Sequence, residues 1–131
     1  MTWHHLLQQV RDAGHYTTDG EAEHVLDAVL AALGSQLTGD ERRDLQAVLP
    51  DRASAVFSSR TPLPRPVAAP ALVETVATAL NTTPLRARWD VTSVLFALTD
   101  LTGERLTSRI LTQLPRGYAL LFGRADLTTA A

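Results

Sequence analysis

The sequence predicts an all-helical (all-α) protein made of two tandem four-helix units, about eight short helices in all. Two observations support this class: the chain repeats itself at an offset of 65 residues, and each half carries apolar residues at helical spacing between residues that begin or end helices. A repeated unit with one incompletely buried face is expected to close against its copy. We therefore predict that the units pack with pseudo-twofold symmetry into one globular domain.

The repeat extends over most of each half. Sliding the sequence by 65 positions aligns the halves without a gap, and Leu-Pro followed seven residues later by Phe closes both. The aligned pairs include Leu7 with Leu72, Thr17 with Thr82, Ala22 with Ala87, Val29 with Val94, Leu49 with Leu114, and Phe57 with Phe122. Matches that keep this order along the whole half indicate a duplicated structural unit.

The first two helices of the first unit are expected on either side of Gly14. Thr2 is placed to cap a helix over residues 3–13, which Gly14 is expected to end by adopting the left-handed conformation. Thr18 and Glu21 have the spacing of a capping box, in which the Thr oxygen accepts a backbone N–H and the Glu reaches back. The second helix follows, with apolar residues Ala22, Val25, Leu26, Val29, Ala32 and Leu33.

The third and fourth helices of this unit meet at a Leu-Pro pair. Thr38 and Glu41 form a second capping-box pattern, which begins a helix that ends at Leu49. Pro50 lacks an N–H and has a fixed φ, so it suits the first turn of a short helix over residues 51–57. We expect Leu49 and its repeat equivalent Leu114 to be buried where these helices join.

The second unit follows the same plan. Its helices are predicted over residues 70–80, over 84–100 after the cap Thr83, over 103–114 after the cap Thr102, and from Pro115 through Phe122. The helix from residue 84 is apolar on two sides, which is typical of a central helix. Leu85, Trp89, Leu95 and Phe96 form one side, and Ala87, Val91, Val94 and Leu98 form the other.

These elements define four segments of the chain. Residues 1–60 form the first unit, a proline-rich linker occupies 61–70, residues 71–124 form the second unit, and 125–131 are expected to be a flexible tail. Four prolines in the linker disfavour helix, so it is predicted to be extended and stiff.

Composition excludes several classes of function. The chain has no cysteine, so disulfides, thiolate metal sites and a cysteine nucleophile are excluded, and a reducing, cytoplasmic location is favoured. All twelve basic residues are arginine, which excludes Schiff-base chemistry and a P-loop lysine. A net charge of −2 disfavours nucleic-acid binding, and no apolar run is long enough to cross a membrane. No sequence motif indicates a cofactor.

Several of these residues also resemble a known family. The helix with Val-Leu-x-Ala-Leu, then Thr-Gly-Asp-Glu, Leu-Pro and a final Phe, repeated 65 residues on, is similar to the bacterial family catalogued as domain of unknown function 2267. The resemblance runs from about Trp3 to Phe122 and is most specific at Gln113-Leu114-Pro115 and Leu121-Phe122-Gly123, while the first repeat has Val48 in place of the Gln. It implies an all-helical tandem repeat and brings no activity or catalytic residues.

The histidines suggest one alternative function. His4, His5, His15 and His24 all lie in the first unit, close in sequence to Asp19, Glu21, Glu23 and Asp27. None forms a His-x-x-x-His pair, and His4 and His5 point about 100° apart on a helix, so a metal site would need tertiary packing to gather His5, His15 and His24. We expect surface histidines and assign no metal or catalytic residue. The alternative is an enzyme or metal-dependent protein using these His and Asp/Glu side chains.

The arginines suggest the favoured function. The only basic grouping consists of Arg60, Arg65, Arg86, Arg88 and the helical pair Arg105 and Arg109, with Trp89 nearby, and both residue types are enriched at protein interfaces. Of these we take Arg60, Arg65, Arg86 and Arg88 as the candidate surface. The structural alternative is that Arg86 and Arg88 are solvated, or paired with Glu74 and Asp90, beside a buried Trp89. We predict a non-catalytic interaction or regulatory module that binds a protein partner or a second copy of the chain.

Overall fold

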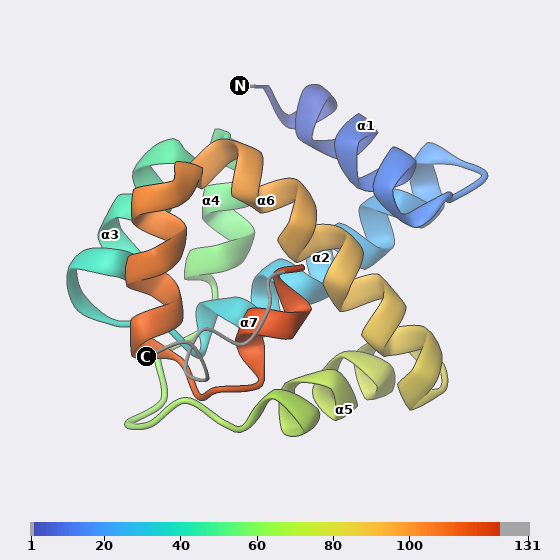
Figure 1. Ribbon diagram of the computed structural model, residues 1–131. Helices are drawn as coiled ribbons and strands as arrows, with labels where there is room; N and C mark the ends of the chain where they lie inside the picture. The colour runs from blue at the N-terminus through green and yellow to red at the C-terminus, as the bar shows by residue number, and fades with distance from the viewer. Residues whose placement is uncertain (1, 124–131) are drawn as a thin grey trace.

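The computed structural model describes residues 2–123, and this part of the chain contains seven α-helices and no strand (Figure 1). The predicted all-α class is therefore confirmed. The predicted tail at 125–131 lies outside the described residues. The helices are α1 (Trp3–Gly14), α2 (Asp19–Gly34), α3 (Gly39–Val48), α4 (Asp51–Ser58), α5 (Ala69–Leu80), α6 (Pro84–Gln113) and α7 (Tyr118–Leu121). None of them is long and apolar enough to span a membrane.

The helices of the two halves contact each other across the molecule. Within the halves, α1 packs on α2 and α5 packs on α6; between them, α1 packs on α6, α2 packs on α5, and α3 packs on α6. Figure 1 shows α1 and α5 on opposite sides of α6. The contacts between helices of different halves are those expected if each half buries its apolar face against the other. The pseudo-twofold symmetry stays a prediction.

The residues of α6 were expected to form two of about eight helices, and the described residues contain seven helices. Residues 84–100 and 103–114 were predicted as separate helices, and α6 does consist of two helical segments that meet at a kink near the predicted break, where Gly103 has the non-helical angles φ 71° and ψ 170°. The two segments follow each other without a loop and are counted as one helix. Thr102 does not cap a new helix, because its hydroxyl bonds Thr99 O and the hydroxyl of Thr107. Glycine tolerates the positive φ, so the chain turns without a loop, and the later part of α6 lies beside α3 (Figure 1).

Three of the predicted threonine caps are present. The hydroxyls of Thr2, Thr18 and Thr83 each accept the N–H of the residue three positions on. Thr38 is the N-cap residue of α3, as predicted, but the predicted capping box is wrong, because the Thr38 side chain makes no capping hydrogen bond. Its predicted partner Glu41 pairs with two residues of the other half instead, Arg109 at 2.8 Å and Gln113 at 3.0 Å.

Gly14 ends α1 for a different reason from the predicted one. The left-handed residue is His15, with φ 55°, and Gly14 is the last helical residue. Gly14 is required by packing, because a Cβ there would overlap the ring of buried Tyr16. Its carbonyl also accepts a hydrogen bond of 3.0 Å from Nε1 of Trp89.

The proline-rich linker is non-helical through residue 68, as predicted, and it is bound to the body of the protein. The N–H of Leu63 donates to Ser35 O at 2.9 Å, and the N–H of Val67 donates to the side-chain oxygen of Gln36 at 2.7 Å. Gln36 is buried, and Tyr118 donates its hydroxyl to Val67 O at 2.9 Å. The linker is therefore fixed by both halves.

The core is built mainly from Leu, Val and Ala, with Phe57 and Tyr118 among its largest fully buried side chains. The two Leu-Pro joints place Leu49 and Leu114 in this core, at 6% and 7% exposure, as predicted. Pro50 is the N-cap of α4 and not its first helical residue, and Pro115 precedes α7 by three positions. Both prolines come just before a helix without belonging to it.

Leu114→Ala is expected to lower the free energy of unfolding by about 2 to 4 kcal/mol, because it removes buried methyl groups and leaves a cavity. Pro115→Ala should cost far less, since proline acts here mainly by restricting the unfolded chain. Urea denaturation measures both, with Leu85→Ala as the control, because Leu85 is 81% exposed. A loss at Leu114 no larger than that at Leu85 would contradict the core position of Leu114.

Candidate functional site: a groove between α5, α6 and α7

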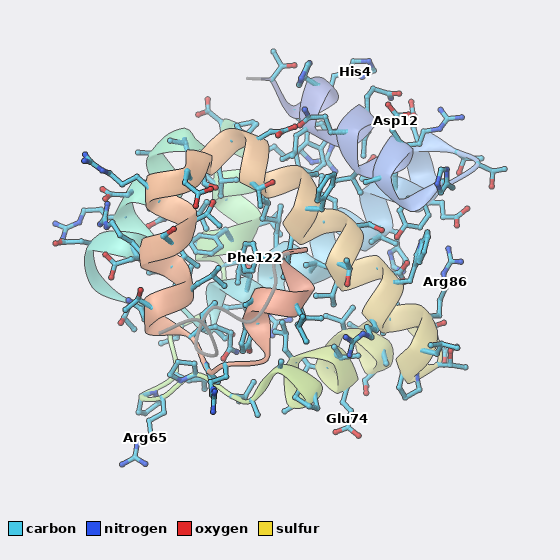
Figure 2. The ribbon with its side chains drawn as sticks, in the orientation of Figure 1. His4, Asp12, Arg65, Glu74, Arg86 and Phe122 are labelled. Carbon is cyan, nitrogen blue, oxygen red and sulfur yellow. The ribbon has the colours of Figure 1, made fainter. Side chains whose placement is uncertain are left out.

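The structure does not gather the four candidate arginines into one patch. Arg60 and Arg65 lie in the segment between α4 and α5, and Figure 2 shows Arg65 and Arg86 on opposite sides of the molecule. Within residues 2–123, the side chains of Arg60, Arg65 and Arg88 make no hydrogen bond or ion pair, and all three are exposed. Whether each of the four contacts a partner stays a prediction.

Arg86 differs from the other three because it is already paired. Its guanidinium lies 3.4 Å from Glu21 Oε1, 3.4 Å from Asp90 Oδ1, and over the ring of Tyr16. This is the internal pairing that we considered as the structural alternative. A guanidinium held by two carboxylates and an aromatic ring has little left to offer a partner, so Arg86 is best explained as a structural residue.

A buried polar contact joins the halves beside Arg86. Tyr16 donates its hydroxyl to Asp90 Oδ1 at 2.5 Å, and Asp90 is only 3% exposed. Burial raises the pKa of Asp90, while the Tyr16 hydrogen bond and the Arg86 charge oppose that rise. Burial also raises the pKa of Tyr16 well above its usual value, and Asp90 adds to this effect. The contact fastens the α1–α2 turn to α6, and sequence analysis missed it.

The histidines are dispersed over the surface. His4, His5, His15 and His24 are all exposed, and no group of three or more His, Asp or Glu side chains within residues 2–123 could hold a metal ion. His15 stacks on Trp89 with the ring centroids 6.3 Å apart. The structure therefore does not bring His5, His15 and His24 together as the metal hypothesis required.

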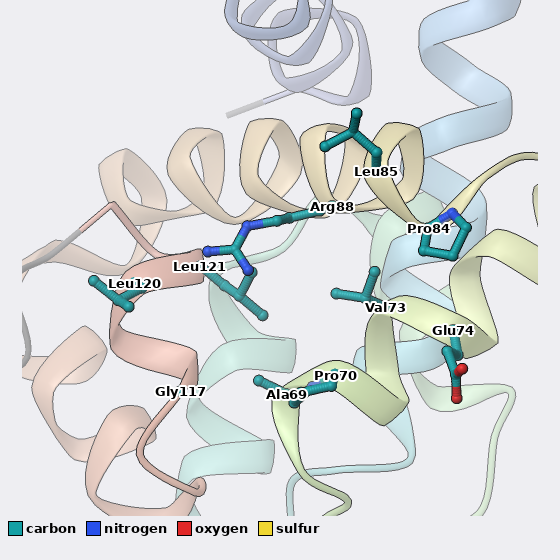
Figure 3. Close-up of a pocket in the computed structure, with 10 residues that line it drawn as sticks. All are labelled: Ala69, Pro70, Val73, Glu74, Pro84, Leu85, Arg88, Gly117, Leu120 and Leu121. Carbon is teal, nitrogen blue, oxygen red and sulfur yellow. The ribbon is translucent and has the colours of Figure 1, made fainter.

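An apolar groove of about 600 Å³ lies between α5, α6 and α7 in the second half (Figure 3). We call it the docking groove and define it by its lining residues, which are Ala69, Pro70, Val73, Glu74, Pro84, Leu85, Arg88, Gly117, Leu120 and Leu121. Its volume is within the range of ligand pockets. Leu85 and Leu120 are 81% and 53% exposed, so large apolar side chains remain in water along its rim.

Local sequence signals bring the three walls together. Pro70 occupies the first turn of α5, and Pro84 begins α6 after the Thr83 cap, so both helices start at the groove. Gly117 leads into α7, and a Cβ there would lie 3.0 Å from Ala69 Cβ. Glycine at this position therefore allows α7 to approach α5 closely, which narrows the groove.

Arg88 provides the groove with a free positive charge. Figure 3 shows its guanidinium extending from α6 over the groove toward Leu121, while Glu74 points away at the far rim. As noted, Arg88 has no partner within the described range. An unpaired guanidinium beside apolar surface suits a carboxylate on a bound molecule.

Sequence analysis was wrong about the burial of one apolar side of α6. The side with Leu85, Trp89, Leu95 and Phe96 was expected to be buried. That is right for Leu95, which is fully buried, and wrong for Leu85, Trp89 and Phe96, which are 81%, 47% and 58% exposed. The opposite side of α6 is the buried one, with Ala87, Val91, Val94 and Leu98 in the core. An apolar helix side left in water is itself a signal of an interaction surface.

Comparison with known proteins identifies the family of this chain and assigns no activity to it. No curated protein matches the chain. The family model described as "Uncharacterized conserved protein (DUF2267)" matches residues 3–121, which is nearly the whole chain and includes every helix that forms the groove. The chain therefore belongs to the DUF2267 family of uncharacterized conserved proteins.

Proposed function

We propose that this protein is a non-catalytic interaction module that binds an amphipathic helix of a protein partner in the docking groove. The observation that carries the proposal is that Arg88, which has no partner among residues 2–123, lies beside exposed Leu85 and Leu120 on an apolar groove. An amphipathic helix with one acidic residue next to its apolar face complements both features, because it covers the leucines and pairs with the guanidinium.

The dimensions of the groove fit such a partner. Along α5 the lining of the groove runs from Ala69 to Glu74, which is about 8 Å or roughly one and a half turns of a bound helix. Anchors at i, i+3 and i+4 occupy one face over that length. The proposal includes a cytoplasmic location, which the lack of cysteine favours, and excludes nucleic acid as the partner, which the net charge of −2 disfavours.

The alternative is an enzyme or metal-dependent protein with a site built from His and Asp/Glu of the first unit. The exposed histidines and their dispersal among residues 2–123 give it no specific support. Among the described residues, burial raises the pKa of Asp90, whose hydrogen bond with Tyr16 is explained by the joint between α6 and the α1–α2 turn. Burial also raises the pKa of Asp27, which lies 3.9 Å from Arg52, and this ion pair accounts for its position. We therefore keep the interaction module as the proposed function.

A synthetic helical peptide of about 14 residues tests the proposal. It carries leucines at i, i+3, i+4 and i+7, glutamates in its first turn and lysines in its last turn, with a fluorophore for anisotropy. We expect saturable binding that Leu120→Glu weakens about tenfold or more, because the variant places a charge in the apolar contact. Arg88→Glu should weaken binding about three- to tenfold, through loss of an ion pair and repulsion.

Arg105→Glu is the matched control. Arg105 is an exposed residue of α6 that, like Arg88, has no partner within the described residues, and it lies outside the groove. Its reversal should leave peptide binding unchanged, and thermal unfolding of all three variants should stay within about 0.5 kcal/mol of the parent. Equal losses at Arg88 and Arg105 would show only non-specific charge attraction, and no saturable binding would reject the groove as a helix site.

A further inference from the structure

The docking groove has opposite charges at its two ends. Arg88 extends toward the α7 end, near Leu121, whereas Glu74 of α5 lies on the outer rim at the end near Pro84, with its carboxylate turned outward (Figure 3). Both side chains are exposed, and neither forms a hydrogen bond or ion pair through its charged group within residues 2–123. An apolar floor therefore lies between a free cation and a free anion.

The residues around the groove are apolar near α7 and mostly polar beyond its other end. A second pocket of about 570 Å³ lies next to the groove, and Glu74 and Pro84 help to line both. The other lining residues there are Ala77, Thr78, Asn81 and Thr82, which are mostly polar. The α7 end thus offers leucines and a positive charge, while the far end offers polar groups and a negative charge.

We infer that the docking groove binds its partner helix in one direction, with the acidic N-terminal turn of that helix at Arg88 and its basic C-terminal turn at Glu74. This inference rests on the proposed function. Acidic residues in the first turn and basic residues in the last turn are favoured in helices generally, because they complement the helix dipole. Such a helix forms two attractive pairs in this direction and two repulsive pairs in the reverse one.

The charges are sufficient to select one direction. An exposed ion pair typically favours association by up to about fivefold. Reversing the helix exchanges two attractions for two repulsions, so the two directions should differ in occupancy on the order of tenfold or more at low salt. The apolar contacts contribute equally to both directions, because leucines at helical spacing can cover the floor either way.

A nitroxide on the peptide described above reports its direction through broadening of amide NMR signals of the full chain. A label on the peptide N-terminus should broaden Gly117 and Leu120, and a label on its C-terminus should broaden Asn81 and Thr82. In the double variant Glu74→Arg with Arg88→Glu, the two patterns should exchange while affinity stays within about threefold, because both ion pairs re-form in the reversed helix.

A peptide with glutamine in place of every charged residue is the control, and its two labels should broaden both ends of the groove. Equal broadening of both ends by the charged peptide, or unchanged patterns in the double variant, would overturn the inference and leave the helix site standing. Failure of the charged and the neutral peptide alike to bind would overturn the proposed function and the inference with it.

Discussion

Residues 1–60 produced alone are expected to lack a cooperative thermal transition, or to associate into dimers, because their apolar faces are completed by the second half. Helix α1 packs on α6, and α2 packs on both α5 and α6. A chain of about 60 residues buries too little surface to compensate for exposing such contacts. Calorimetry and sedimentation of the fragment, beside the full chain, measure the effect.

Polar contacts strengthen this expectation. Separation of the halves would leave Tyr16 without its carboxylate partner Asp90, and it would leave the backbone of Thr38 without Gln113, whose side chain accepts from its N–H at 2.7 Å and donates to its O at 3.2 Å. In the fragment water replaces these partners, so each lost hydrogen bond lowers the stability only by its net contribution, about 0.5 to 1.5 kcal/mol. A monomeric fragment that melts cooperatively near the temperature of the full chain would refute the closed two-unit arrangement.

Gly34→Ala is expected to destabilise the protein by about 3 kcal/mol, near the upper end for overpacking of a core. Gly34 ends α2, and an added Cβ would overlap the backbone carbonyl oxygen of Phe57 in α4. Phe57 is fully buried, so its backbone cannot move away without disturbing the core. The Gly34 carbonyl also accepts a hydrogen bond from Arg42, which fixes this end of α2 further.

Gly20→Ala in the same helix is the matched control. Gly20 lies in the first turn of α2, and an added Cβ there meets no atom within 4 Å. Alanine should therefore stabilise the helix by about 0.5 to 1 kcal/mol, because it reduces the entropy lost on folding. Urea denaturation of both variants should give changes of opposite sign. A Gly34→Ala protein as stable as the parent would show that α2 and α4 do not pack as closely as the structure indicates.

The candidate site was predictable only in part. Arg88 was identified from the sequence as one of four interface arginines, and it is the one that lines the docking groove. Its neighbour Arg86 has the same charge and a similar sequence context, but it is paired with Glu21, 65 residues away. The second partner of Arg86, Asp90, lies four residues on and was named from the sequence, whereas Glu21 is brought to it by the fold.

The sequence alone determined where most helices begin and which joints are buried. Caps at Thr2, Thr18 and Thr83 act within three residues, and the Leu-Pro joints place Leu49 and Leu114 in the core, so spacing along the chain was enough. These features depend on hydrogen bonds and periodicity between near neighbours, which a single sequence records directly.

Only the tertiary structure decided which apolar side of α6 meets the core and which polar groups pair. Both sides of the helix are apolar, so periodicity could not choose between the side with Val91 and the side with Trp89. Tyr16 bonds Asp90, which is 74 residues further along the chain. Glu41 was predicted to cap α3, but it pairs with Arg109, which is 68 residues further along. Such pairings depend on how the halves close, because burial and electrostatics act between groups that are close in space, whatever their separation along the chain.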